Sequence, residues 1–241
     1  MTEFRFLLFS LLAAAPLLAL QPAATAQEVP AAAPQPQDFS AAETLLWFGD
    51  QLKQVTAPVI LQYSFEKQGT LEAGFRDEVR FIIQKVKPDG MKAAALEFFT
   101  GERRFPIPPE DNTNTNPVLK VYLQGDIYEM NRLTDPEGKA RERWRYFQRR
   151  IKFAFADAAT IEEVKFEFAG KSYTGKKVTI TPYVDDPRRA AFEKFADKVY
   201  TFTVSEELPG FLYEVRATVP GGKGAPPLID ETLRLAAIKP L

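Results

Sequence analysis

The sequence predicts a mainly β (α+β) fold, with a single strongly curved antiparallel sheet or half-barrel of about ten strands and two or three helices. Apolar residues recur at every second position over much of the chain after residue 58, which is the period of a half-buried strand. Turn-forming tracts such as KPDG at residues 87–90 separate these runs, as in an antiparallel meander. The chain also contains 20 Phe and 8 Tyr, which suit a sheet core or an apolar pocket.

The N-terminal segment is predicted to direct export. Residues 6–20 form an apolar run, shorter than the roughly 20 residues that a spanning helix needs, and an A-x-A cleavage site follows at residues 24–26. We therefore expect a signal peptide over residues 1–26 and a secreted, periplasmic location in a Gram-negative type of envelope. An uncleaved N-terminal anchor is the alternative. Residues 27–38 are rich in Ala and Pro and predict an extended linker, which leaves residues 39–241 as one β-rich domain.

The first elements of that domain are a helix and a meander. Ser40 and Glu43 fit a capping box, and the helix should end before Pro58. Strands are expected at residues 59–66, 75–86 and 92–100, then a long loop at 101–117, then a strand from Leu119 to Leu123 turned by Gly125-Asp126.

Residues 139–155 allow two interpretations. Trp144, Phe147 and Ile151 form an apolar helical stripe, but residues 151–155 alternate like a strand. We expect a helix to about Arg150 and a strand after it. A short helix should begin at Asp186-Pro187. The remaining expected features are strands at residues 164–168, 178–180, 200–204, 212–219 and 232–238, and a flexible loop at residues 221–224.

Composition excludes several classes of function. The chain has no Cys and no His, so it can form neither a disulfide nor a Ser-His-Asp triad. Its 31 basic and 32 acidic residues do not predict nucleic-acid binding. Asp185-Asp186 could contribute to a carboxylate metal site, but a solvated loop pair is the commoner situation. We predict no catalytic residue, no metal site and no cofactor, and hence not an enzyme.

The candidate ligand-binding residues lie on two predicted helices. These residues are Trp47 and Phe48 on the first helix, and Trp144 and Phe147 on the helix that ends near Arg150, where Arg145 and Arg149 are placed to meet an anionic headgroup. The basic residues between Lys139 and Lys152 suit an anionic membrane surface. Alternatively, they belong to an ordinary amphipathic helix that lies on the sheet. The Phe-rich strands likewise either pack a core or line an apolar groove, since two or three helices cover little of such a large sheet.

The order of the elements resembles a known family. A helix at residues 40–54, a meander at 59–99 and return strands at 178–235 are similar to the periplasmic lipoprotein-carrier (LolA/LolB-like) superfamily. The resemblance implies a half-open barrel with helices in its mouth that holds acyl chains. It carries over no binding residue, and the loop at 101–117 and the segment at 182–210 depart from the family pattern.

The predicted function is therefore that of a non-enzymatic periplasmic protein that binds a hydrophobic or amphiphilic envelope molecule, in the manner of a lipid or lipoprotein carrier. One alternative is a structural or protein-interaction module of the envelope with no ligand cavity and an unknown partner. Another is a carboxylate-based hydrolase that uses Glu206, Glu207 or Glu214.

Overall fold

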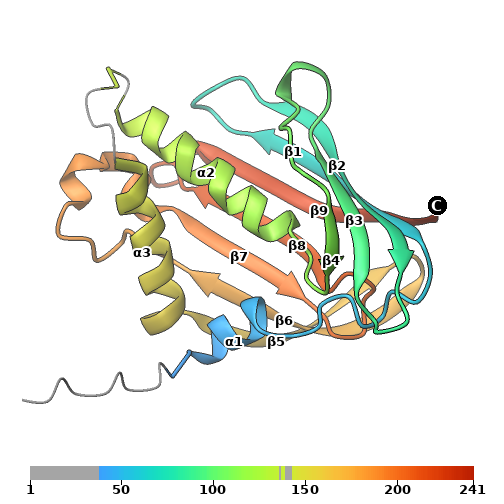
Figure 1. The fold of residues 1–241 in the computed structure, drawn as a ribbon. Helices are drawn as coiled ribbons and strands as arrows, with labels where there is room; N and C mark the ends of the chain where they lie inside the picture. Colours follow the sequence, from blue (N-terminus) through green and yellow to red (C-terminus); the bar gives the residue numbers. More distant parts are fainter. Residues whose placement is uncertain (1–37, 136, 139–142) are drawn as a thin grey trace, which may run out of the picture. The chain divides into compact units, whose positions relative to one another are not determined.

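The computed structural model describes residues 38–135, 137–138 and 143–241. The predicted signal peptide, its cleavage site and residues 27–37 of the predicted linker lie outside the described residues. The described part forms one antiparallel sheet of nine strands in the order β4-β3-β2-β1-β9-β8-β7-β6-β5, with three α-helices (Figure 1). The sheet is open, because β4 and β5 each have one neighbour. The prediction of a mainly β fold built on one antiparallel sheet is confirmed.

The strands are β1 (Val59–Gln68), β2 (Phe75–Val86), β3 (Lys92–Phe98), β4 (Glu110–Thr113), β5 (Thr160–Phe168), β6 (Lys171–Ile180), β7 (Val199–Val204), β8 (Leu212–Val219) and β9 (Ile229–Pro240). The helices are α1 (Ala41–Trp47), α2 (Val118–Thr134) and α3 (Arg143–Asp157). Short 3₁₀ turns are η1 (Gly101–Arg103), η2 (Arg189–Ala191) and η3 (Glu193–Asp197).

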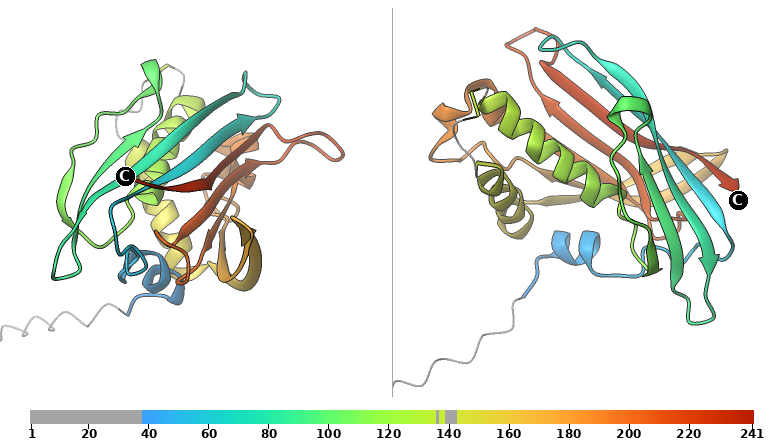
Figure 2. Two further views of the ribbon diagram at one scale, coloured as in Figure 1. Left: turned by 90° about the vertical axis from the view of Figure 1, so that its right-hand side faces the viewer. Right: turned by 45° about the horizontal axis from the view of Figure 1, so that its top comes forward.

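One face of the sheet carries the core. On β1, the side chains of Leu61, Tyr63 and Phe65 are buried while that of Ser64 is exposed, as the two-residue period of a strand requires. The three helices lie on this inner face (Figure 2). Burial of alternate apolar side chains between the sheet and the helices is therefore the main stabilising interaction.

Several sequence predictions are confirmed. The capping box is present: the hydroxyl of Ser40 accepts a hydrogen bond from the backbone N–H of Glu43, and the Glu43 carboxylate accepts one from the backbone N–H of Ser40. Strands β2 and β8 have the predicted bounds, and the glycine-rich loop at 221–224 joins the antiparallel strands β8 and β9.

The predicted strand at Leu119–Leu123 and the predicted turn at Gly125-Asp126 are wrong, because both lie inside α2. Leu119, Tyr122, Leu123, Asp126 and Ile127 are buried at intervals of three and four residues, so the helical period prevails over the short alternation. The predicted long loop is also partly wrong, since residues 101–117 contain η1 and β4.

Two other helices differ from their predicted lengths. The first helix ends at Trp47 and not near Gln54, and the chain then turns toward β1. The strand predicted after Arg150 is wrong: α3 continues to Asp157, because Ile151, Ala154 and Phe155 lie on the same buried face as Phe147. Residues 139–142 lie outside the described part.

The helix predicted at Asp186-Pro187 is replaced by the two 3₁₀ turns η2 and η3. The count of about ten strands is close to the nine present in the described residues. Within the same residues, no helix is both long and apolar enough to cross a membrane.

Candidate functional site: an aromatic groove beside helix α2

A groove of about 300 Å³ lies between α2, the β1–β3 side of the sheet and the segment at residues 105–107. Its lining is mostly apolar, with one charged end. The lining residues are Phe65, Lys67, Phe75, Phe98, Phe99, Phe105, Pro106, Ile107, Val121, Tyr122, Gln124, Gly125, Asp126, Tyr128, Glu129 and Glu231. This volume is at the lower end of the range of about 300–1,000 Å³ for small-molecule sites.

The sheet wall of the groove is a cluster of four phenylalanines. The ring of Phe99 lies 4.8 Å from that of Phe65, 5.8 Å from that of Phe75 and 4.7 Å from that of Phe98, measured between centroids. Phe99 follows the end of β3 and has a left-handed backbone, with φ of 65°. A bulky residue rarely adopts this conformation, and such strain is concentrated at binding sites. At Phe99, this strained backbone conformation holds a ring that forms part of the groove wall.

The rim of the groove is formed by the segment after η1. Phe105 pairs with Phe98 through an isolated β-bridge, and its side chain is 48% exposed. An exposed aromatic ring at the edge of an apolar groove can cover a bound molecule at little cost to the folded core. The segment from Phe105 to Ile107 is therefore placed to contact a ligand at the mouth.

The helical wall is unusually thin at Gly125. This residue lies in the middle of α2, where a glycine destabilises a helix by about 1 kcal/mol relative to alanine. A Cβ atom added at Gly125 would meet nothing within 4 Å. Packing with the rest of the protein therefore does not require a glycine here, and the missing side chain enlarges the groove.

The charged end of the groove begins with a cross-strand pair on the inner face. Lys67 on β1 is directly opposite Glu231 on β9 in the antiparallel ladder, and Nζ of Lys67 lies 3.1 Å from Oε1 of Glu231. Lys67 also forms an ion pair and a hydrogen bond with Glu129 of α2. The hydroxyl of Tyr122 donates a hydrogen bond of 3.0 Å to Oε2 of Glu231. Four side chains from β1, β9 and α2 thus form one cluster.

A second buried pair lies next to the first. Nζ of Lys198, which precedes β7, contacts Oδ1 of Asp126, and both side chains are fully buried. The hydroxyl of Tyr200 donates a 2.5 Å hydrogen bond to Oδ2 of Asp126. Both carboxylate oxygens of Asp126 therefore have partners, as a buried charge requires.

Burial and neighbouring charges shift the proton affinities of these groups. Burial acts to lower the pKa of Lys67, but the carboxylates of Glu231 and Glu129 outweigh it, and the pKa is raised. The pKa of Glu231 is raised by burial, against the opposing effect of Lys198, and the carboxylates of Glu129 and Asp126 add to the rise. The pKa of Tyr122 is well above its usual value because of burial and the Glu231 carboxylate.

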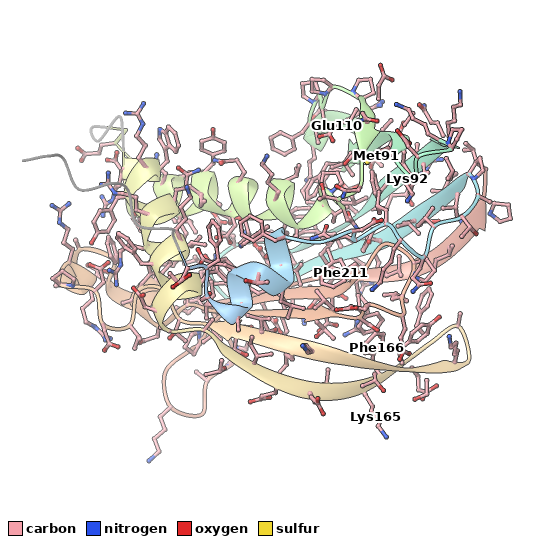
Figure 3. The ribbon with its side chains drawn as sticks, turned by 60° about the horizontal axis from the view of Figure 1, so that its bottom comes forward. Met91, Lys92, Glu110, Lys165, Phe166 and Phe211 are labelled. Carbon is pink, nitrogen blue, oxygen red and sulfur yellow. The ribbon has the colours of Figure 1, made fainter. Side chains whose placement is uncertain are left out.

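The residues predicted from sequence to bind a ligand lie elsewhere, and none of the six lines the groove. Trp47 is half-buried and meets Phe155 edge to face at 5.6 Å. Phe48 is 51% exposed and contacts Phe39. It borders a separate surface hollow that also includes Phe211, labelled in Figure 3.

The predicted residues of α3 are divided between the core and the surface. Phe147 is fully buried, whereas Arg145 and Arg149 are exposed. Trp144 is half-buried and lies 6.1 Å from Tyr128, a residue that lines the groove. Of the six residues predicted to bind a ligand, Trp144 thus has a ring contact with a residue of the groove lining.

Lys67 and Glu231 were not predicted, because the strand that contains Lys67 was expected to end too early and the strand that contains Glu231 to begin too late. Leu61, Tyr63, Phe65 and Lys67 continue one alternation along β1, but the predicted strand stopped at residue 66. On β9, Glu231 precedes Leu233 and Leu235 on the same face, but the predicted strand began at residue 232. Extending each alternation by one step would have put a Lys and a Glu on the inner face.

Two of the three carboxylates considered for a hydrolase, Glu206 and Glu214, form ion pairs. Glu206 forms an ion pair of 2.7 Å with Lys53, and Glu214 forms one of 2.5 Å with Arg234. Among the described residues, no group of three or more His, Cys, Asp or Glu side chains is arranged to hold a metal ion.

No protein-family model and no curated protein matches this chain. Among solved structures, the chain is similar to the Mycobacterium tuberculosis lipoprotein LppX, with 9% identity, a TM-score of 0.33, and coverage of 81% of this chain and 94% of that one. It is also similar to the LolA superfamily protein NE2245 from Nitrosomonas europaea, with 8% identity, a TM-score of 0.22, and coverage of 83% and 93%. The predicted resemblance is confirmed as one of architecture, and at these TM-scores it says nothing of a ligand.

Proposed function

We propose that this protein is a non-enzymatic carrier or binding protein of the cell envelope, and that it holds the apolar part of a hydrophobic or amphiphilic molecule in the groove beside α2. The observation that carries the proposal is the space in front of Gly125. A helical glycine that no packing contact requires faces a wall of phenylalanines, and the space between them is open. Such an arrangement lowers the stability of the fold and is useful for a bound molecule.

The groove has the properties that an aliphatic or aromatic ligand needs. Each methylene group transferred from water into an apolar site contributes about 0.8 kcal/mol. The strained Phe99 and the half-exposed Phe105 provide ring surface on two sides of such a chain. Affinity should therefore rise with chain length until the groove is full, which distinguishes burial of a chain from recognition of a headgroup alone.

The test is to fill the groove with a larger side chain at position 125. We expect the neutral dye N-phenyl-1-naphthylamine to bind the purified domain with increased fluorescence, and Gly125→Leu to weaken that binding by at least about tenfold. Lys120→Leu is the matched control, because it adds a leucine to an exposed position of the same helix that does not line the groove.

The stability of both variants should be measured in parallel. Leucine is a better helix former than glycine, so Gly125→Leu should remain folded. Unchanged dye binding by a folded Gly125→Leu variant, or no saturable dye binding by the wild type, would refute the proposal.

The alternative of a protein-interaction module would use a sheet edge. The free edge strand β5 carries exposed Glu162, Glu163, Lys165 and Glu167. Figure 3 shows Lys165 pointing away from the sheet, whereas Phe166 packs against Tyr173 and Tyr213. Charged side chains along an edge discourage the addition of another strand, so this alternative has less support than the groove.

Binding to an anionic membrane stays a prediction. Arg145, Arg149 and Lys152 are exposed on α3 beside Phe153, whose side chain is 54% exposed. A basic surface that includes an apolar residue suits an anionic bilayer. Replacing Arg145 and Arg149 by Glu should reduce co-sedimentation with vesicles that contain anionic lipid. Unchanged co-sedimentation of a folded variant would assign these residues to ordinary surface.

A further inference from the structure

The charged end of the groove carries an excess of negative charge among the described residues. The carboxylates in contact there are those of Glu72, Asp126, Glu129 and Glu231, and the cations are Lys67, Arg132 and Lys198. Four anions thus face three cations. The surplus is one negative charge, and Lys67, Glu231, Asp126 and Lys198 are buried, where charge interactions are stronger than at the surface.

The surplus can be assigned to Glu129 and Glu231. Asp126 and Lys198 compensate each other, and Tyr200 donates to the remaining oxygen of Asp126. Arg132 and Glu72 form a bidentate pair in which both nitrogen–oxygen distances are 2.8 Å. What remains is Lys67, which is shared between the two glutamates and lies 3.7 Å from Glu72.

Glu231 is the less satisfied of the two glutamates. Its side chain is buried, and it lines the groove. Oε2 accepts a hydrogen bond from Tyr122, but Oε1 accepts no hydrogen bond from the described residues, and its contact with Lys67 is an ion pair only. A buried carboxylate oxygen that accepts no hydrogen bond costs free energy, and a donor from a ligand can recover part of it.

From this geometry we infer that the groove selects amphiphiles with a cationic amine headgroup, whose ammonium binds beside Glu129 and Glu231 while the apolar tail extends along the phenylalanine wall. The inference rests on the proposed function of the groove. It specifies the sign of the headgroup and the residues that recognise it.

The opposite sign of headgroup fits this site poorly. An anion would approach Glu129 and Glu231, and Lys67 is already engaged by both. Burial is the main cause of the raised pKa of Glu231, and the carboxylates of Glu129 and Asp126 add to it, which also disfavours a further negative charge at this position. Gln124 also lines the groove, and its buried Nε2 atom has no partner. A terminal amide can present its nitrogen or its oxygen, so it accepts a headgroup of either sign.

The experiment compares three molecules with the same tail. Dodecylammonium, 1-dodecanol and dodecanoate would each be titrated, below their micelle concentrations and at pH 7, against the complex of the protein with N-phenyl-1-naphthylamine. We expect dodecylammonium to displace the dye at a concentration about tenfold lower than dodecanoate. Glu231→Gln and Glu129→Gln should each reduce the tenfold preference for dodecylammonium over dodecanoate. Glu163→Gln, at an exposed position on β5, should leave this preference unchanged.

The outcomes separate this inference from the proposed function. If dodecanoate competes as well as dodecylammonium, or if 1-dodecanol competes best because Glu231 is protonated and donates a hydrogen bond, the inference is overturned and the groove keeps its function. If the dye does not bind the wild type, the proposed function fails first. Should Glu231→Gln not fold, Glu129→Gln, which is more exposed, provides the test: a preference unchanged in that variant would overturn the inference.

Discussion

The inner face of the sheet has two halves that are built from the same kinds of residue but differ in how they are filled. In the half beneath α3, the ring of Phe147 meets Tyr183 at 5.5 Å and Phe192 at 5.3 Å, and Phe155 meets Phe202 at 5.4 Å. We call this the filled half. In the half beside α2, Phe65, Phe75, Phe98 and Phe99 face the groove, and we call this the open half.

The difference lies in the covering helix. In the filled half, α3 supplies large rings at Phe147 and Phe155 that enter the space above the sheet. In the open half, α2 contributes Tyr122 and Tyr128 to the groove lining as well, but the small residues Val121 and Gly125 leave space in front of the phenylalanine wall. The number of aromatic residues on the strands therefore does not determine whether a face becomes a core or a binding site. What decides between a core and a binding site is the volume of the side chains that the opposing helix contributes.

The largest expected effect concerns the filled half. Phe147→Ala should lower the free energy of unfolding by about 3–5 kcal/mol, because it removes a fully buried ring and leaves a cavity. Urea denaturation measures this effect, with binding of N-phenyl-1-naphthylamine as the second readout. The comparison between the halves predicts lost stability with little change in dye affinity for the folded fraction. A stable variant that fails to bind would instead make Phe147 a ligand residue.

The second effect is a loss of stability at alkaline pH that involves both halves. Burial, together with the Asp126 carboxylate, raises the pKa of Tyr200, and the pKa of Lys198 is raised because Asp126 and Glu231 outweigh the effect of burial. A lysine or tyrosine whose pKa is higher in the folded state stabilises the protein below its unfolded value of about 10, and this stability is lost as the pH rises further. The free energy of unfolding should thus fall above about pH 10.

The measurement is urea denaturation at several alkaline pH values, with tyrosine absorbance recorded at the same time. The buried Tyr122 and Tyr200 should ionise together with unfolding. The filled half should contribute as well, because burial raises the pKa of Tyr183. A free energy of unfolding that does not change above pH 10 would contradict the assignment of these buried pairs.

Sequence was a good guide to the sheet and a poor guide to the groove. The alternation that predicts β2 and β8 with their correct bounds reflects burial on one face, which is a local property of each strand. Helix α2 was missed because Leu119, Val121 and Leu123 alternate over five residues and Gly125 suggests a turn. The longer helical period through Met130 outweighs both signals, since it buries seven side chains.

The groove itself could not be predicted, because it depends on what α2 lacks. A glycine inside a helix and a glycine in a turn look alike until the element is assigned. The buried charges were missed for a related reason. Lys67 and Glu231 are 164 positions apart in the chain and become partners only through the pairing of β1 with β9. The predicted aromatic candidates were chosen from helices, whereas the groove takes most of its rings from strands and one loop.

A smaller effect should separate the groove from the site predicted at α1. Phe105 and Phe48 are 48% and 51% exposed, so replacing either with alanine should change the free energy of unfolding by less than about 1 kcal/mol. Phe105 lines the groove, and Phe48 does not. Phe105→Ala should therefore weaken binding of N-phenyl-1-naphthylamine by about tenfold, and Phe48→Ala should not. The reverse result would move the binding site to α1.

The last comparison concerns two glycines, Gly125 beside the groove and Gly175 on β6. Gly125→Ala should raise the free energy of unfolding by about 0.5–1 kcal/mol, since alanine favours the helix and its Cβ meets nothing within 4 Å. Gly175 on β6 lacks a side chain for a different reason: a Cβ there would lie 2.5 Å from the carbonyl oxygen of Val204 and 2.9 Å from the ring of Phe166.

Gly175→Ala should consequently destabilise the protein, by about 1–3 kcal/mol. The pair is measured by urea denaturation under identical conditions, and dye affinity is measured for Gly125→Ala. A gain of stability at Gly125 accompanied by weaker binding would show that this glycine favours the ligand at the expense of the fold. If Gly125→Ala destabilised the protein as Gly175→Ala does, the space beside α2 would be a requirement of packing, and the contrast between the two halves would disappear.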